Sequence, residues 1–236
     1  MANRILICLL LLAVSIPGLA EFSGKGELGL VVARGNSDTE TGNVRLELDY
    51  QQDRWSNESV FSAVYGRDAG ETNNSRWVLS NRTNFDLSEV SYLVGALRYD
   101  RDRFSSFSYQ STVAVGYGRR LVKTDSHRLK AEVGPGFRFA ELRESGESEN
   151  EVILRGYLDY RWRISDTAQL TNRFLVEAGD DNTFAENTLG LSVAVNSRIS
   201  LKTAFSVRHN TDVEPGRKKT DTLTTMNLVY NFGGNQ

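Results

Sequence analysis

TGNVRLELDYQ, residues 41–51, alternates between apolar and polar side chains without a break. One register holds Gly42, Val44, Leu46, Leu48 and Tyr50, and the other holds Thr41, Asn43, Arg45, Glu47, Asp49 and Gln51. Successive side chains of a strand point to opposite faces, whereas a helix would scatter both sets. The segment therefore predicts a β-strand with one apolar face and one charged face.

The same alternation recurs along the chain and predicts about twelve strands, an even number. The further segments are 25–34, 55–66, 76–87, 91–100, 107–120, 127–138, 151–163, 167–178, 183–196, 199–209 and 221–232. Connections after odd-numbered segments, such as 67–75, 142–150 and 211–219, are mostly longer and polar, and those after even-numbered segments are mostly tight turns. This arrangement is typical of an antiparallel up-and-down barrel of the outer membrane, with both chain ends on the periplasmic side.

The N-terminus has the order of a secretory signal peptide. Arg4 precedes an apolar run at 5–16, and Pro17 is followed by the small-residue pattern Gly18-Leu19-Ala20. The run is too short to span a bilayer, so we expect cleavage after Ala20 and export of the remaining chain. Residues 1–20 are thus predicted to be the signal peptide and residues 21–236 the β-barrel domain.

Composition excludes several classes of function. The chain carries 28 Lys and Arg against 30 Asp and Glu, which gives no reason to expect a nucleic acid partner. The one cysteine, Cys8, lies in the predicted signal peptide, so the mature chain has no disulfide, thiolate metal site or cysteine nucleophile. We expect no cofactor, and the sequence indicates no oligomeric state.

Alternation alone does not decide whether the apolar face lines a core or meets lipid, and a soluble β-sandwich or lipocalin-like barrel is the alternative. The apolar register has no Asp, Glu, Lys or Arg between the strand ends, and twelve strands enclose more room than side chains fill. Aromatic residues also gather near strand ends on that register, as expected for two girdles at the membrane interfaces. The predicted girdle residues are Tyr50, Trp55, Trp77, Tyr99, Phe107, Trp162, Tyr230 and Phe232. We therefore predict a transmembrane barrel in the outer membrane of a Gram-negative bacterium, in contact with lipid and lipopolysaccharide.

Four short motifs carry a resemblance to a known family. They are GNSD at 35–38, YGRRL at 117–121, AEVGPGFR at 131–138 and LVYNF at 228–232. In this order they resemble the bacterial outer-membrane barrels called salt-induced outer-membrane proteins, which are grouped as a domain of unknown function. The resemblance implies an outer-membrane location, a link to envelope or salt stress, and no established activity. The last strand, with Phe232 near its end, also resembles the signal read by the outer-membrane assembly machinery, although four residues follow that aromatic.

No catalytic or metal site is predicted. His127 and His209 fall at opposite ends of the barrel, and neither has a serine or carboxylate two residues away within its own predicted strand. The acidic segments 144–149 and 180–181 lack the spacing of a calcium loop. Pro135, between two glycines, removes a ladder hydrogen bond, so a bulge or bend is expected there.

The charged register supplies the candidate functional residues, which would face the lumen. The predicted basic wall consists of Arg82, Arg98, Arg120, Arg128, Lys130, Arg138, Arg155, Arg161, Arg163 and Arg173. The predicted acidic wall consists of Glu27, Glu47, Asp49, Glu58 and Glu186. Two facing walls of opposite charge suggest a narrow porin-like channel that favours small anions or zwitterions. The alternatives are a structural barrel whose lumen is closed by salt bridges and, third, an outer-membrane hydrolase.

Overall fold

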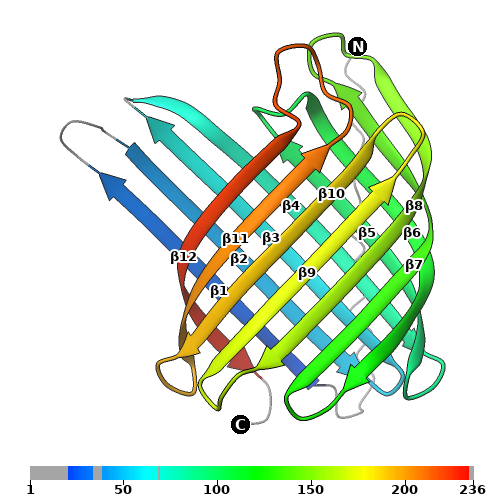
Figure 1. The fold of residues 1–236 in the computed structure, drawn as a ribbon, viewed down its shortest axis with the longest axis vertical. Helices are drawn as coiled ribbons and strands as arrows, with labels where there is room; N and C mark the ends of the chain where they lie inside the picture. The colour runs from blue at the N-terminus through cyan, green and yellow to red at the C-terminus, as the bar shows by residue number, and fades with distance from the viewer. Residues whose placement is uncertain (1–20, 34–38, 69, 234–236) are drawn as a thin grey trace.

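Twelve antiparallel strands form one closed barrel in the computed structural model, and β12 closes the barrel against β1 (Figure 1). The structure describes residues 21–33, 39–68 and 70–233, with the backbone alone for 31–33 and 39; the predicted signal peptide and the GNSD motif lie outside them. The strands are β1 (Glu21–Ala33), β2 (Thr39–Gln52), β3 (Trp55–Asp68), β4 (Glu71–Asp86), β5 (Ser91–Asp102), β6 (Phe107–Lys123), β7 (His127–Leu142), β8 (Ser148–Arg163), β9 (Ala168–Ala178), β10 (Thr183–Ala194), β11 (Ile199–Asn210) and β12 (Thr220–Gly233). Among these residues no helix is long and apolar enough to cross a membrane.

The predicted strand count and the up-and-down topology are confirmed. Glu21 and Gly233 begin β1 and end β12 at the same end of the barrel as the short connections after even-numbered strands, and Ser23 pairs with Gly233. We call this the turn end, and the opposite end, which carries the 211–219 connection, the loop end.

One predicted connection is wrong. The polar segment 67–75 was expected to be a loop, but β3 continues to Asp68 and β4 begins at Glu71. Thr72 and Asn74 pair with Arg67 and Gly66, with a shift of register between the last two residues. A hairpin that projects beyond the apolar band carries polar residues on both faces, so its composition resembles a loop although its backbone is still paired.

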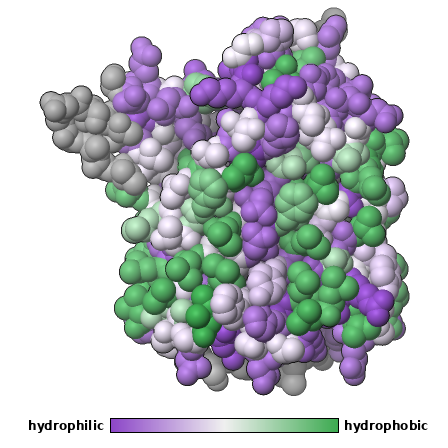
Figure 2. Space-filling model, viewed as in Figure 1, coloured by the Kyte–Doolittle hydropathy of each residue, from purple (hydrophilic) through white to green (hydrophobic). Residues whose placement is uncertain are grey.

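The apolar register faces outward, as predicted. Leu46 is 38% exposed, whereas Glu47 next to it is 3% exposed. Figure 2 shows hydrophobic side chains over the middle and lower parts of the wall and hydrophilic ones at its upper end. The lumen therefore receives the charges, and the outer wall has the surface that a bilayer requires.

The prediction that Phe107 belongs to an outward aromatic girdle is wrong. It is 3% exposed and lines a small pocket inside the barrel with Asp100, Phe184 and Arg208. The pairing of β6 with β7 shifts register between Phe107 and Tyr109. Because one extra residue in a strand reverses the faces on either side of it, the bulge turns Phe107 inward while Tyr109 stacks on Tyr99.

A bulge or bend is expected at Pro135, and no bulge that shifts the register occurs there. The β6–β7 ladder stops between the pairs Ala114–Gly136 and Tyr117–Val133, and it resumes without a shift of register. A Cβ on Gly134 would lie 2.0 Å from the carbonyl oxygen of Val115, so only glycine permits this close approach of the two strands.

A polar cluster lies on the outward face of β3 and β4, which the sequence pattern had not indicated. The amide Nδ2 of Asn57 donates to Thr83 Oγ1 at 2.7 Å and to Asn81 Oδ1 at 3.2 Å. Asn81 Nδ2 donates to Ser59 Oγ at 2.8 Å. These side chains largely satisfy one another, which is how polar groups are accommodated in an apolar environment.

Candidate functional site: the charged lumen

The inward register of the strands builds the lumen, and its two halves differ. Around β5 to β8 the lumen is filled by side chains. Tyr92 donates its hydroxyl to Glu132 Oε1 at 3.0 Å, and Arg155 donates to Glu132 Oε2 at 3.1 Å. The guanidinium of Arg82 lies 4.4 Å from the ring centre of Tyr157. This half therefore resembles a polar core, in which buried charges are paired and hydrogen-bonded.

The other half holds a cavity of about 720 Å³. It is lined mainly by strands β9 to β12 and β1 to β4, with further residues from β5, β6 and β8, and it extends from Phe104 at the loop end to Ser165 and Thr167 at the turn end. Eleven Lys and Arg and eight Asp and Glu residues line it. The cavity is thus a polar passage along one side of the barrel with a moderate excess of positive charge.

Three short ion pairs of the described residues, each at 3.2 Å or less, cross the lumen between strands that lie far apart around the barrel. Arg173 of β9 contacts Glu47 of β2, with Nη1 and Oε2 at 3.2 Å. Toward the loop end, Arg76 of β4 contacts Glu186 of β10 at 3.1 Å. A third pair, also at that end, joins Arg208 of β11 to Asp102 of β5 at 2.8 Å. These contacts narrow the lumen without filling the cavity beside them.

Most residues of the predicted basic wall are neutralised by nearby acids. Arg98 and Arg76 share Asp100, and Lys130, Arg161 and Arg173 surround Asp159. The remaining pairs are Arg82 with Glu58 and Glu132, Arg98 with Glu177, Arg120 with Asp86, Arg138 with Glu151, and Arg155 with Glu132. Arg128 and Arg163, at the turn end, have no ion pair with the residues the structure describes. The basic wall is therefore an interleaved network, and its free positive charge is concentrated at the turn end.

The predicted acidic wall is similarly interleaved. Glu27 accepts a hydrogen bond from Lys202 Nζ at 2.7 Å. Glu47 lies within 3.2 Å of Lys25, Arg45 and Arg173. Of the five residues predicted for this wall, Asp49 alone has no ion pair with the described part of the chain.

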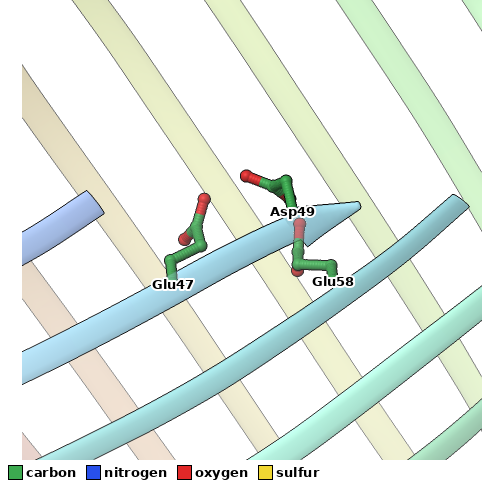
Figure 3. A group of neighbouring side chains, drawn as sticks. All are labelled: Glu47, Asp49 and Glu58. Carbon is green, nitrogen blue, oxygen red and sulfur yellow. The ribbon is translucent and has the colours of Figure 1, made fainter. Parts of the chain in front are cut away.

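Three of these carboxylates converge, as Figure 3 shows for Glu47 and Asp49 of β2 and Glu58 of β3. Each contributes an oxygen to a group whose members lie within 4.8 Å of one another, a donor set suited to a divalent cation. Asp49 is the strand partner of Glu58. The sequence indicated the Glu47–Asp49 alternation, but the cluster depends on the hairpin register. Arginines neutralise two of the three carboxylates, so the cluster belongs to the ion-pair network.

The two histidines lie apart on the outward face. His127 Nδ1 is 2.8 Å from Tyr160 Oη, and its ring stacks on Trp162. His209 Nδ1 is 2.8 Å from Thr220 Oγ1. Neither has a serine or carboxylate partner among the described residues, so the arrangement does not provide a nucleophile and its base.

The connection 211–219 is anchored to the turns beside it at the loop end. The backbone N–H of Glu214 donates to Ser106 Oγ at 3.0 Å, and Arg217 Nη1 donates to the carbonyl of Phe104 at 3.2 Å. The N–H of Glu144 donates to Glu214 Oε1 at 2.8 Å. The connection therefore lies against the filled half of the lumen.

The sequence that forms this barrel matches a known protein family. Residues 26–232 match the family described as protein of unknown function, DUF481. The chain belongs to this family. A relative of this DUF481 protein is the uncharacterized protein YdiY of Escherichia coli (strain K12), which is 27% identical over 214 residues and covers 89% of this chain and 83% of YdiY.

Solved structures similar to this DUF481 protein are outer-membrane barrels. The NanC porin aligns with a TM-score of 0.51 and 10% identity over 89% of this chain and 97% of its own. An outer membrane channel of Pseudomonas putida F1, COG4313, aligns with a TM-score of 0.51 and 11% identity over 90% and 95%. The translocator domain of the autotransporter NalP from Neisseria meningitidis has a TM-score of 0.51 and 13% identity over 89% and 87%. At these identities the likeness shows the fold, which is that of an outer-membrane β-barrel.

Proposed function

We propose that this DUF481 protein is a narrow aqueous channel for small polar solutes in the outer membrane of a Gram-negative bacterium. The observation that carries the proposal is the cavity that runs along the lumen from Phe104 to Ser165. Charged and polar side chains line it from the loop end to the turn end, which suits hydrated solutes. The filled half of the lumen restricts its width, so the solutes are small.

The charge on the cavity wall favours anions or zwitterions. Eleven basic residues line the cavity against eight acidic ones, and Arg163 has no ion pair with any described residue. Charges of both signs on facing walls orient a zwitterion, and the net excess raises the local concentration of anions. The solute would therefore be a small carboxylate, phosphate or amino acid rather than a cation.

Planar-bilayer recording tests this proposal. The purified protein is expected to give discrete conductance steps. Under a salt gradient, its reversal potential should indicate selectivity for anions over cations. Glu47→Gln and Arg173→Gln should move that potential in opposite directions, because both residues line the cavity and carry opposite charges. A preference for cations would overturn the charge assignment.

The second candidate is a structural barrel closed by salt bridges. The pairs Arg76–Glu186 and Arg208–Asp102 favour it, because both join opposite walls near the loop end. If correctly folded protein gives no conductance steps in the bilayer, the result supports this candidate over the channel. A lipase assay addresses the third candidate, a hydrolase, for which the histidines supply no matching geometry.

Location and assembly follow from the same proposal. Residues 1–20 would direct export and be removed, the outward apolar wall would meet lipid and lipopolysaccharide, and β12 with Phe232 would be read by the outer-membrane assembly machinery. Cell fractionation with N-terminal sequencing checks the first two steps. A deletion strain grown at high salt checks the link to envelope or salt stress.

A further inference from the structure

The seam between β1 and β12 is closed over only part of its length. The two strands pair from Ser23–Gly233 to Leu28–Leu228 and no further along the residues described. Beyond Leu28, β1 continues to Ala33 in contact with β2. On its other side, β12 stays paired with β11 from His209–Thr220 to Ile199–Tyr230. Figure 1 shows β1 leading to the upper left with β2, while β12 turns toward the top with β11.

Two strand edges therefore face one another without pairing. In an antiparallel sheet about half of the backbone groups of a strand point to each neighbour. Residues 29–33 and 220–227 each leave such a set without a strand partner, whereas a closed wall would satisfy them. A closed barrel normally leaves no strand edge unpaired. The unpaired edges at this seam therefore indicate a function for the opening.

The opening lies in the apolar band of the wall. Leu30 is 71% exposed and Met226 is 70% exposed, more than any other large apolar side chain of the described residues. The two flank the opening directly above the last β1–β12 pair. The unpaired edges thus begin at a level where the outer surface would contact acyl chains.

A hydrogen-bonded latch ends the closed part of the seam. Asn43 Nδ2 donates to Asn227 Oδ1 at 2.9 Å, and Asn227 Nδ2 donates to Glu27 Oε2 at 3.1 Å. The bridge passes over Gly29, where a Cβ would lie 2.3 Å from an oxygen of each asparagine. The closed and open parts of the seam therefore meet at a defined point.

The cavity wall near the opening carries apolar side chains among its polar ones. Val64 is the strand partner of Asn43, and Val78 is on the next strand. Both line the cavity together with Leu223 and Thr225 of β12, across the opening. In a lumen otherwise rich in charge, apolar side chains are thus present on both sides of the seam.

We propose that the outer half of the β1–β12 seam is a lateral portal that admits the acyl chain of an amphipathic molecule from the bilayer into the lumen. The chain lies against Val64, Val78 and Leu223, and the polar group of the molecule meets the free backbone edge and the latch. The portal needs the membrane location of the proposed function but does not need axial conduction.

Site-directed fluorescence quenching tests the portal. Cys8 is the one cysteine, so a Cys8→Ser background allows single-cysteine variants. Thr225→Cys, labelled with bimane, is reconstituted into phosphatidylcholine vesicles with plain or brominated acyl chains. Thr188→Cys is the matched control, because Thr188 also lines the cavity and its strand, β10, is paired on both sides. Met226→Cys on the outer surface is the positive control.

Brominated lipid is expected to remove most of the fluorescence at positions 225 and 226 and to leave position 188 unchanged. Equal, weak quenching at 225 and 188 would overturn the portal, and so would equal, strong quenching at both. Leu223→Cys, on the same face of β12, replaces Thr225→Cys if that variant does not fold. Bilayer recording of the same variants separates the two proposals. If position 225 is quenched but the protein gives no conductance, the channel is contradicted and the portal is not.

Discussion

Arg173 of β9 and Glu47 of β2 are 126 positions apart in the sequence, and their side chains meet in the lumen at 3.2 Å. Glu47 is buried and also contacts Lys25 and Arg45. Removing its charge leaves three cations without their shared partner, which should cost about 3 kcal/mol of unfolding free energy. Denaturant unfolding of Glu47→Gln in detergent micelles measures this loss. Glu71→Gln, at an exposed strand end, is the control, and equal stability of the two variants would contradict the prediction.

The ion pairs near the loop end should limit conductance. In the double variant Arg208→Ala, Asp102→Ala a cross-lumen pair is lost without a change in net charge. Single-channel conductance is expected to rise while the reversal potential stays close to that of the wild type. The pair Arg120–Asp86 serves as the control, because it joins strands on one wall. A conductance unchanged by the first double variant would show that the constriction lies elsewhere.

The outward cluster on β3 and β4 should behave as one hydrogen-bonded unit. Asn81→Ala leaves Asn57 with fewer partners in an apolar environment, and the expected cost is about 1–2 kcal/mol. The double variant Asn57→Ala, Asn81→Ala should cost less than the sum of the single variants. Unfolding in lipid vesicles gives all three values, and strict additivity would rule out the coupling.

Gly29 should tolerate no side chain. A Cβ there would lie 2.3 Å from Asn43 Oδ1 and Asn227 Oδ1, and 2.9 Å from the carbonyl oxygen of Met226. Gly29→Ala is expected to break the latch and to cost about 1–3 kcal/mol. Gly26→Ala is the matched control on the same strand, since a Cβ at Gly26 meets nothing within 4 Å. Comparable melting temperatures of the two variants would contradict the close packing at the seam.

Phe107 should contribute more stability than an aromatic residue on the outer wall. Its ring is buried inside the barrel, so Phe107→Ala is expected to leave a cavity and cost about 3–5 kcal/mol. Phe205→Ala removes an outward ring that is 44% exposed and should cost less. Thermal unfolding followed by gel mobility measures the loss of stability in the two variants. A larger loss for Phe205→Ala would contradict the inward position of Phe107.

The sequence by itself determined the barrel. A period of two, sustained through twelve segments with charges confined to one register, specifies the strands and the face each presents, because successive strand side chains alternate between the two faces. The alternation did not predict the face of Phe107, because one extra residue precedes Tyr109. It also did not predict the paired strands at 67–75, because the composition there becomes polar while the backbone stays paired. Both are decided by the partner strand.

The tertiary structure alone decided which charges meet. The sequence placed Glu47 and Arg173 in the lumen, but their contact depends on barrel curvature and on which strands lie opposite. The same holds for Asp49 beside Glu58, which requires the hairpin register, and for the open seam, where β1 and β12 separate after Leu28. Alternation is a local property of one strand, whereas closure, cross-lumen pairing and the seam arise from the relative positions of strands distant in the chain.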